Sequence, residues 1–280
     1  MPWHARLDLD YRCEPANGVQ HSVARFAHTG PLRILQSLYP EGDAICHNVL
    51  VHPPGGLVGG DTLDIAITAA PGSHGLITTP GATRFYRSDG EAALQHTRIA
   101  LQDNARIEWL PLEAICHSGC LAENRLSVTL APTAELIGWD VTALGLPSAS
   151  QPFESGSFRQ HIEVPGLWLE RGRIDASDLR MMNGPLGLAG RRCMASIFFV
   201  AGSKLDRKRR DDALEAARAV IKAHALHDTA AATSPNPQVV VVRALAPLVE
   251  PAMDLMRKVW GAWRGHCWNM PAPGLRIWSM

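Results

Sequence analysis

Apolar and polar residues alternate along much of the chain, and this period-two pattern predicts β-strands with one buried face. Leu7, Leu9 and Tyr11 alternate with charged residues across residues 6–12, and residues 19–28 have the composition of a pairing strand. A third strand, residues 48–51, leads into a glycine-rich turn, and alternation resumes over residues 63–68. The N-terminal part of the chain is therefore expected to be β-structured.

A near-repeat of strand, turn and strand follows, starting at Thr62, Thr97, Arg125 and Arg159. The second strands of the first three units align at Leu76, Ile107 and Leu136, about 30 residues apart, which is in the range of stacked repeat units. No isolated pair of strands can bury its own apolar face in water. The pattern therefore favours stacked, layered sheets, although a sandwich made of hairpins is also compatible with it.

Strand signals give way to helical ones in the C-terminal third. Residues 204–227 lack Gly and Pro and place an apolar face at helical spacing, with Asp206 as N-cap. A surface loop is expected at 228–238, a short buried strand at 239–242, and a last helix at 247–263. That helix carries a stripe with Trp260 and Trp263, which could be core or partly a docking face for another protein.

The fold prediction is thus a mainly β protein of stacked strand–turn–strand units, like a β-helix, with two α-helices in the C-terminal third. We expect residues 1–280 to form one domain, with a β-rich body at 1–203 and a helix-containing region at 204–280.

Composition narrows the class of protein. The 280 residues are 46% hydrophobic, enough for a sizeable core, and 27 basic residues balance 27 acidic ones. A formal net charge of zero gives no global attraction to nucleic acid or an anionic membrane. The sequence has neither a signal peptide nor a run of about 20 apolar residues, so a cytoplasmic protein with reduced cysteines is expected.

The glycines between residues 53 and 88 have a spacing close to that of a phosphate loop. Such a loop needs a lysine before its Ser or Thr, and this chain has Asp61 there, whose carboxylate would repel phosphate. A glycine-rich turn in which Asp61 caps backbone amides is the favoured interpretation.

Cys116, His117 and Cys120 form the densest group of soft metal ligands in the sequence. Two thiols and an imidazole could bind zinc or nickel, but a fourth ligand is not evident. Buried cysteines beside a surface histidine remain the plainer interpretation.

Asp61, Asp140 and Glu170 each follow an apolar or glycine-rich strand segment. A carboxylate in a buried layer is costly unless it is paired or solvated, so these residues either form ion pairs or line a wet cavity. Three arginines are the expected partners in the first case: Arg84, Arg87 and Arg171. No complete catalytic motif accompanies them, so we predict no catalytic residues.

Several segments together resemble one family: PPGGLVGGDTL, TTPGATRFYRS, EWLPLEAICHSGCLAENR, ALGLPSASQPFESG, WLERGRIDA, NGPLGLAG and RALAPLVEPAMDLMRKVWGAWR. Nearly the whole chain is similar to the UreD (UreH) urease accessory proteins. The resemblance implies a stacked, β-helix-like fold and a non-enzymatic scaffold that binds UreF-type and UreG-type proteins and the urease apoenzyme.

The resemblance also implies a water-filled passage that leads nickel toward urease, with nickel in transit and no stably bound cofactor. Its acidic lining would be Asp61, Asp140 and Glu170, supported by Thr83 and the three arginines named above. Two rival hypotheses stay open: a hydrolase that uses Cys116 and His117, and a solenoid-like binding module with no metal role.

Overall fold

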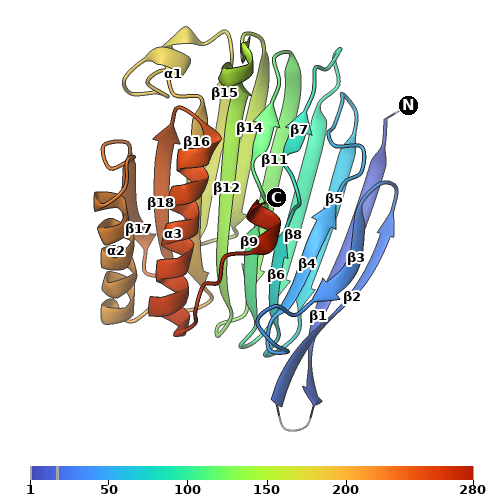
Figure 1. Ribbon diagram of the computed structural model, residues 1–280, viewed down its shortest axis with the longest axis vertical. Coiled ribbons are helices and arrows are strands. Elements are labelled where there is room, and N and C mark those ends of the chain that lie inside the picture. The colour runs from blue at the N-terminus through green and yellow to red at the C-terminus, as the bar shows by residue number, and fades with distance from the viewer. Residues whose placement is uncertain (1, 17–18, 280) are drawn as a thin grey trace.

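The computed structural model describes residues 2–16 and 19–279, and in that part the strands form two sheets that face each other (Figure 1). Helices cover the outer side of the second sheet. Within these residues no helix is long and apolar enough to cross a membrane.

The first sheet contains the N-terminal hairpin at one edge, where β1 and β2 pair as predicted from residues 6–12 and 19–28. Its order across the sheet is β15 (Trp168–Asp175), β14 (Gly156–Val164), β11 (Cys120–Leu130), β8 (Ala93–Leu101), β5 (Thr62–Ala69), β1 (His4–Ala16) and β2 (Val19–Thr29).

The second sheet runs β17 (Ala230–Asn236), β18 (Val239–Ala246), β16 (Cys193–Ala201), β12 (Glu135–Leu146), β9 (Arg106–Leu110), β6 (His74–Thr78), β4 (Cys46–Val51) and β3 (Arg33–Leu38). Three short strands branch from this order: β7 (Thr83–Phe85), β10 (Ala114–Cys116) and β13 (Gln151–Pro152).

The stacked arrangement predicted from the near-repeat is confirmed. Each of the first three units crosses from one sheet to the other, as β5 to β6, β8 to β9 and β11 to β12, and like strands pair in parallel. Parallel neighbours cannot be joined by a tight hairpin, so these units form the coils of a solenoid. The fourth unit differs, because β14 and β15 form an antiparallel hairpin within the first sheet.

The stacking register differs by one residue from the alignment of Leu76, Ile107 and Leu136. Ile107 pairs with Leu136, but Leu76 pairs with Glu108. A one-residue shift reverses the face to which a side chain points. Ile107 and Leu136 therefore lie between the sheets, whereas Leu76 and Glu108 face the helices.

The two long helices pack on the second sheet to form a second apolar layer (Figure 1). α2 (Arg207–Lys222) begins after Asp206, whose carboxylate accepts a hydrogen bond from the Arg209 amide at 2.9 Å, so the predicted N-cap is confirmed. α3 (Val249–Trp268) runs five residues past the expected end. Short helical turns complete the chain: α1 (Leu179–Asn183), η1 (Pro147–Ala149) and η2 (Arg276–Ser279).

The expected surface loop at residues 228–238 is wrong, because β17 occupies most of it. β17 pairs only with β18, so it is an edge strand. Edge strands tolerate proline and polar residues that interior strands do not, which explains why Pro235 in this segment misled the prediction.

Candidate functional site

Asp140 lies on β12 and points between the two sheets. Its carboxylate accepts hydrogen bonds from Asn124 Nδ2 on β11 at 2.7 Å, Gln160 Nε2 on β14 at 2.7 Å and Thr142 Oγ1 at 3.1 Å. Burial raises the pKa of Asp140 to about 6, against the lowering effect of the Gln160 and Thr142 hydrogen bonds, with the charge of Glu170 adding to the rise. No cationic side chain is among its hydrogen-bond partners in the described residues.

Three amide side chains form one row across the first sheet beneath Asp140. The register aligns Gln95 on β8 with Asn124, and Asn124 with Gln160. Gln95 Nε2 donates to Asn124 Oδ1 at 3.3 Å, so the hydrogen bonds continue from Gln95 through Asn124 to Asp140. This polar row, Gln95–Asn124–Asp140–Gln160, runs through a layer that is mostly apolar.

One end of the polar row opens into a cavity of about 460 Å³, which Asp140 and Gln160 line together with Glu170 and Arg243. The exposed Asp228 is also part of the lining, so the cavity reaches the surface. Arg243 Nε donates to Glu170 Oε2 at 2.9 Å and joins β18 to β15 across the gap between the sheets. The predicted pairing of Glu170 with Arg84, Arg87 or Arg171 is thus wrong.

The other end of the polar row reaches a second cavity of about 310 Å³, lined by Gln95, His52, Thr79 and Thr83. Its rim contains Pro53, Gly55, Pro80 and Gly81, which belong to the glycine-rich stretch singled out in the sequence. Burial lowers the pKa of His52, so the imidazole at this end favours its neutral form. The glycine-rich stretch therefore borders an entrance to the interior.

Asp61 stands apart from the polar row. Its buried carboxylate accepts hydrogen bonds from the backbone amides of Trp3 at 2.7 Å and Val58 at 2.9 Å. This is the amide-capping role expected for a glycine-rich turn, and neither Arg84 nor Arg87 contacts it. The structure thus brings Asp140 and Glu170 to one cavity but leaves Asp61 outside both linings.

The three arginines proposed as partners all lie on the surface. Arg84 and Arg87 are exposed, and Arg87 Nε lies 3.7 Å from Asp89 Oδ1. Arg171 is exposed on the outer face of the first sheet, opposite His161. Side chains with these positions cannot neutralise a carboxylate between the sheets.

Cys116 and Cys120 are buried in the layer between the sheets, whereas His117 stacks on Tyr86 with ring centroids 4.9 Å apart. In the part of the chain that the structure describes, no three His, Cys, Asp or Glu side chains have an arrangement that could hold a metal ion. Burial raises the pKa of the Cys116 thiol well above its usual value, which opposes use as a nucleophile. The geometry favours neither the metal site nor the hydrolase.

Trp260 and Trp263 are buried beneath α3, at 2% and 0% exposure. Trp260 Nε1 donates to Glu108 Oε2, and Trp263 Nε1 donates to the Ala213 carbonyl at 2.9 Å. The indoles fill the layer between the helices and the second sheet, so the tryptophan stripe is core and presents no docking face.

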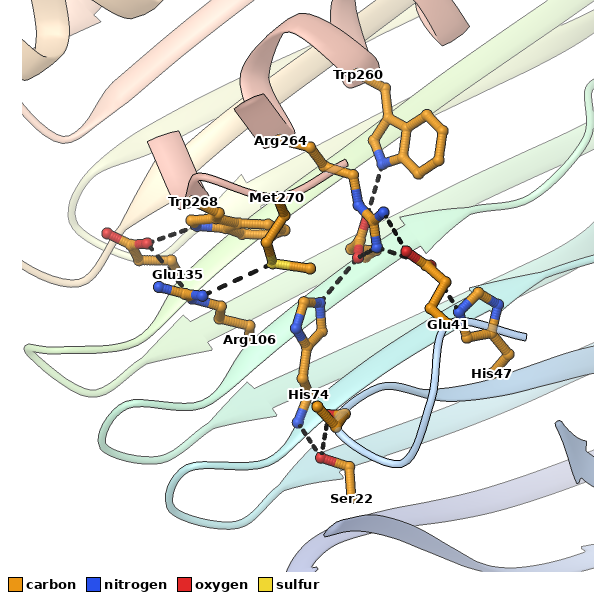
Figure 2. Close-up of polar contacts among 12 residues, drawn as sticks. Ser22, Glu41, His47, His74, Arg106, Glu135, Trp260, Arg264, Trp268 and Met270 are labelled. Atoms are coloured by element: carbon orange, nitrogen blue, oxygen red, sulfur yellow. Dashed lines mark hydrogen bonds and ion pairs between the residues drawn. The ribbon is translucent and has the colours of Figure 1, made fainter. Parts of the chain in front are cut away.

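Sequence reasoning missed a buried charge cluster under α3 (Figure 2). Arg264, fully buried, donates to both carboxylate oxygens of Glu108 at 2.9 Å and to Glu41 Oε2 at 2.7 Å. His74 and His47 lie 2.8 Å and 3.0 Å from these two carboxylates. Burial would raise the pKa of Glu108, but the His74 hydrogen bond and the Arg264 charge lower it to about 2. This cluster joins strands to α3.

The raised pKa of Asp140 predicts a pH dependence of stability. Its folded-state pKa of about 6 exceeds the unfolded value of about 3.9. Its contribution is therefore most favourable below about pH 4, and we expect the free energy of unfolding to fall by roughly 3 kcal/mol as the pH rises from about 4 to the folded-state pKa of about 6. The Asp140→Asn variant should lack this component. Urea titrations of both proteins from pH 4 to pH 8 check it, and parallel curves would contradict it.

Comparisons with known proteins agree on one family. Residues 4–279 match the family model for the UreD urease accessory protein. The chain is 70% identical to a urease accessory protein UreD of Polaromonas naphthalenivorans and 69% identical to one of Paracidovorax citrulli, each over the full length of both chains. A UreD of Methylibium petroleiphilum is 47% identical, with 99% of each chain covered.

Proposed function

The chain belongs to the UreD family of urease accessory proteins, and on that premise we propose that it is a non-catalytic scaffold that passes nickel to the urease apoenzyme through its polar row. In this proposal it docks on the apoenzyme together with UreF-type and UreG-type partners. Nickel is the cargo of the scaffold and is not held as a resident cofactor.

The observation that carries the proposal is a half-buried carboxylate that lies between the sheets without a cationic partner. With a pKa of about 6, Asp140 is mostly ionised at neutral pH, although its hydrogen-bond partners within the described part of the chain are neutral. A charge that is largely withdrawn from water in this way is costly unless a counter-charge reaches it. Glu170 differs, because Arg243 already neutralises it. Asp140 is therefore the position on the path that best fits a passing cation.

The chemistry of the polar row suits transit better than storage. Its oxygen atoms come from one carboxylate and several amides, which are hard ligands, and nickel binds more strongly where imidazole or thiolate is available. A conducting path must attract its cargo and still release it. A sparse set of oxygen ligands between two cavities meets both conditions.

The test is to co-express urease subunits and the other accessory proteins with this chain, carrying either Asp140→Asn or Gln160→Leu. Both changes leave the surface intact, so the variants should fold and assemble with their partners. We expect the nickel content and activity of the recovered urease to fall several-fold, because the row loses its charge or its continuity.

Asp64→Asn is the matched control. Asp64 lies on β5 of the first sheet and pairs with His4 and Arg98 on the outer face of that sheet, away from the polar row. The control should deliver nickel at the parental level. Melting temperature and recovery of the complex distinguish a blocked path from a misfolded protein. Parental nickel content in urease matured with both path variants would refute the polar row as the route.

A further inference from the structure

Arginines gather on the outer face of the first sheet, opposite the side that holds the polar row. The register places Arg159 beside Arg173, and His161 beside both Arg125 and Arg171, on the adjacent strands β11, β14 and β15. All four arginines are exposed. We call Arg125, Arg159, Arg171 and Arg173 the arginine face.

The arginine face borders a groove of about 420 Å³. Gly172 and Gln160 also line this groove, and Glu123 is the one acidic residue in its lining among the described residues. Four guanidinium groups thus meet one carboxylate in a protein whose formal net charge is zero. Glu163 and Asp175 lie on β14 and β15 just outside the groove, so the four arginines exceed the nearby carboxylates by one.

Two of the four arginines have no acidic partner. Arg125 lies 3.4 Å from Glu123 and Arg173 lies 2.9 Å from Asp175, whereas Arg159 and Arg171 make no ion pair within residues 2–16 and 19–279. A guanidinium presents five N–H donors in a planar fork that matches a carboxylate. The face therefore offers donors that the protein itself does not use.

Protection of the sheet edge explains only part of this arrangement. β15 is the edge strand of the first sheet, and charged residues on an edge strand hinder unwanted pairing. That role accounts for Arg171 and Arg173. Arg125 and Arg159 lie on the interior strands β11 and β14, where there is no edge to protect.

We propose that the arginine face binds the carboxylate side chains of an acidic, extended segment of a partner protein. Arg171 and Arg173 stand two residues apart on one strand, about 7 Å, which is the spacing of alternate side chains in an extended peptide. In the described fold, β15 is also an edge strand, so its outward main-chain N–H and C=O groups could hydrogen-bond to such a segment. Glu123, Glu163 and Asp175 lie among the arginines and would repel a continuous phosphate backbone, so discrete carboxylates fit better.

The test measures fluorescence anisotropy of a labelled peptide of alternating Glu and Ser with the purified full chain at low ionic strength. The parent should bind this peptide, bind the matching Gln–Ser peptide far more weakly, and release the first on addition of salt. The Arg159→Gln, Arg171→Gln double variant should bind about tenfold more weakly, since two charge-assisted contacts are lost.

Arg87→Gln with Arg207→Gln is the matched control, because it removes two exposed arginines from other places and should leave affinity unchanged. Reversing charge with Arg159→Glu and Arg171→Glu should instead create affinity for a Lys–Ser peptide. The proposal is overturned if the parent fails to bind the acidic peptide, if the control loses as much affinity, or if a single-stranded oligonucleotide binds more tightly than the peptide. None of these outcomes bears on nickel transfer through the polar row.

Discussion

Replacing Arg264 with alanine should lower the free energy of unfolding by about 3–5 kcal/mol, because the change leaves buried carboxylates without their cation. Arg264 is fully buried and donates to Glu108 through two nitrogens at 2.9 Å and to Glu41 at 2.7 Å. Glu108 is itself fully buried, and Arg264 is one of the groups that hold its pKa at about 2, so without Arg264 this carboxylate must either stay charged in the interior or take up a proton. Urea denaturation at neutral pH measures the loss.

Arg207→Ala on α2 is the control for this substitution. Arg207 is exposed and makes an i,i+4 pair with Asp211, so its removal should cost at most about 0.5 kcal/mol. Arg264→Lys keeps the charge but not the planar guanidinium. Its loss of unfolding free energy should therefore lie between the losses of Arg264→Ala and Arg207→Ala. If Arg264→Ala were as stable as the Arg207 control, the cluster would contribute nothing to holding α3 on the sheet.

Trp263→Ala should also destabilise the protein by about 3–5 kcal/mol, the usual cost of removing a large aromatic side chain from a core. Trp263 has 0% exposure and packs 6.5 Å from Phe199, measured between ring centroids. Its indole N–H also bonds the Ala213 carbonyl and links α3 to α2. Trp263→Phe keeps most of the volume and should lose about 1 kcal/mol for the hydrogen bond.

Leu248→Ala provides the comparison, since Leu248 is an apolar residue that is 38% exposed just before α3. It should change stability by less than about 0.5 kcal/mol. A Trp263→Ala variant that kept parental stability yet lost capture of its partners would restore the interpretation of the tryptophan stripe as a docking face.

Strand positions and the stacked architecture could be predicted because both leave periodic patterns in the sequence. Alternation defined most strands, and the spacing of about 30 residues indicated repeated coils. The exact pairing could not be predicted, because Leu76 and Ile107 are equally good strand residues and only the packed sheets decide which neighbour each one meets. That single-residue shift is what turns Glu108 toward α3.

Asp140 and Glu170 were recognised as candidates because they are acidic residues beside apolar runs, but the partners of Asp140 were not. A signal for them was present. In CLAENRLSV, the inward positions of β11 read Cys120, Ala122, Asn124, Leu126 and Val128, so the amide interrupts an apolar face. Gln95 and Gln160 interrupt the inward faces of β8 and β14 in the same way. Counting alternate residues would have found the row.

The charge cluster under α3 was harder to foresee, because its members are far apart in sequence. Glu41 and Glu108 are separated from Arg264 by 223 and 156 residues, and no local pattern connects them. In the sequence RIEWL, the residues on both sides of Glu108 are apolar, and nothing nearby indicates which residue pairs with its carboxylate.

These separations also bear on the order in which the chain can fold during synthesis. Each coil of the solenoid contacts the coil about 30 residues before it, so the coils can add one after another as the ribosome releases them. The contact of Glu108 with Arg264 can form only after residue 264 has been made. Likewise, the hydrogen bond from the Trp278 indole to Thr78 joins residues that are 200 positions apart. Until α3 emerges, the nascent chain presents an apolar sheet face on which Glu108 has its histidine partner but not its arginine. Packing of α3 against that face is therefore expected to be a late step of folding.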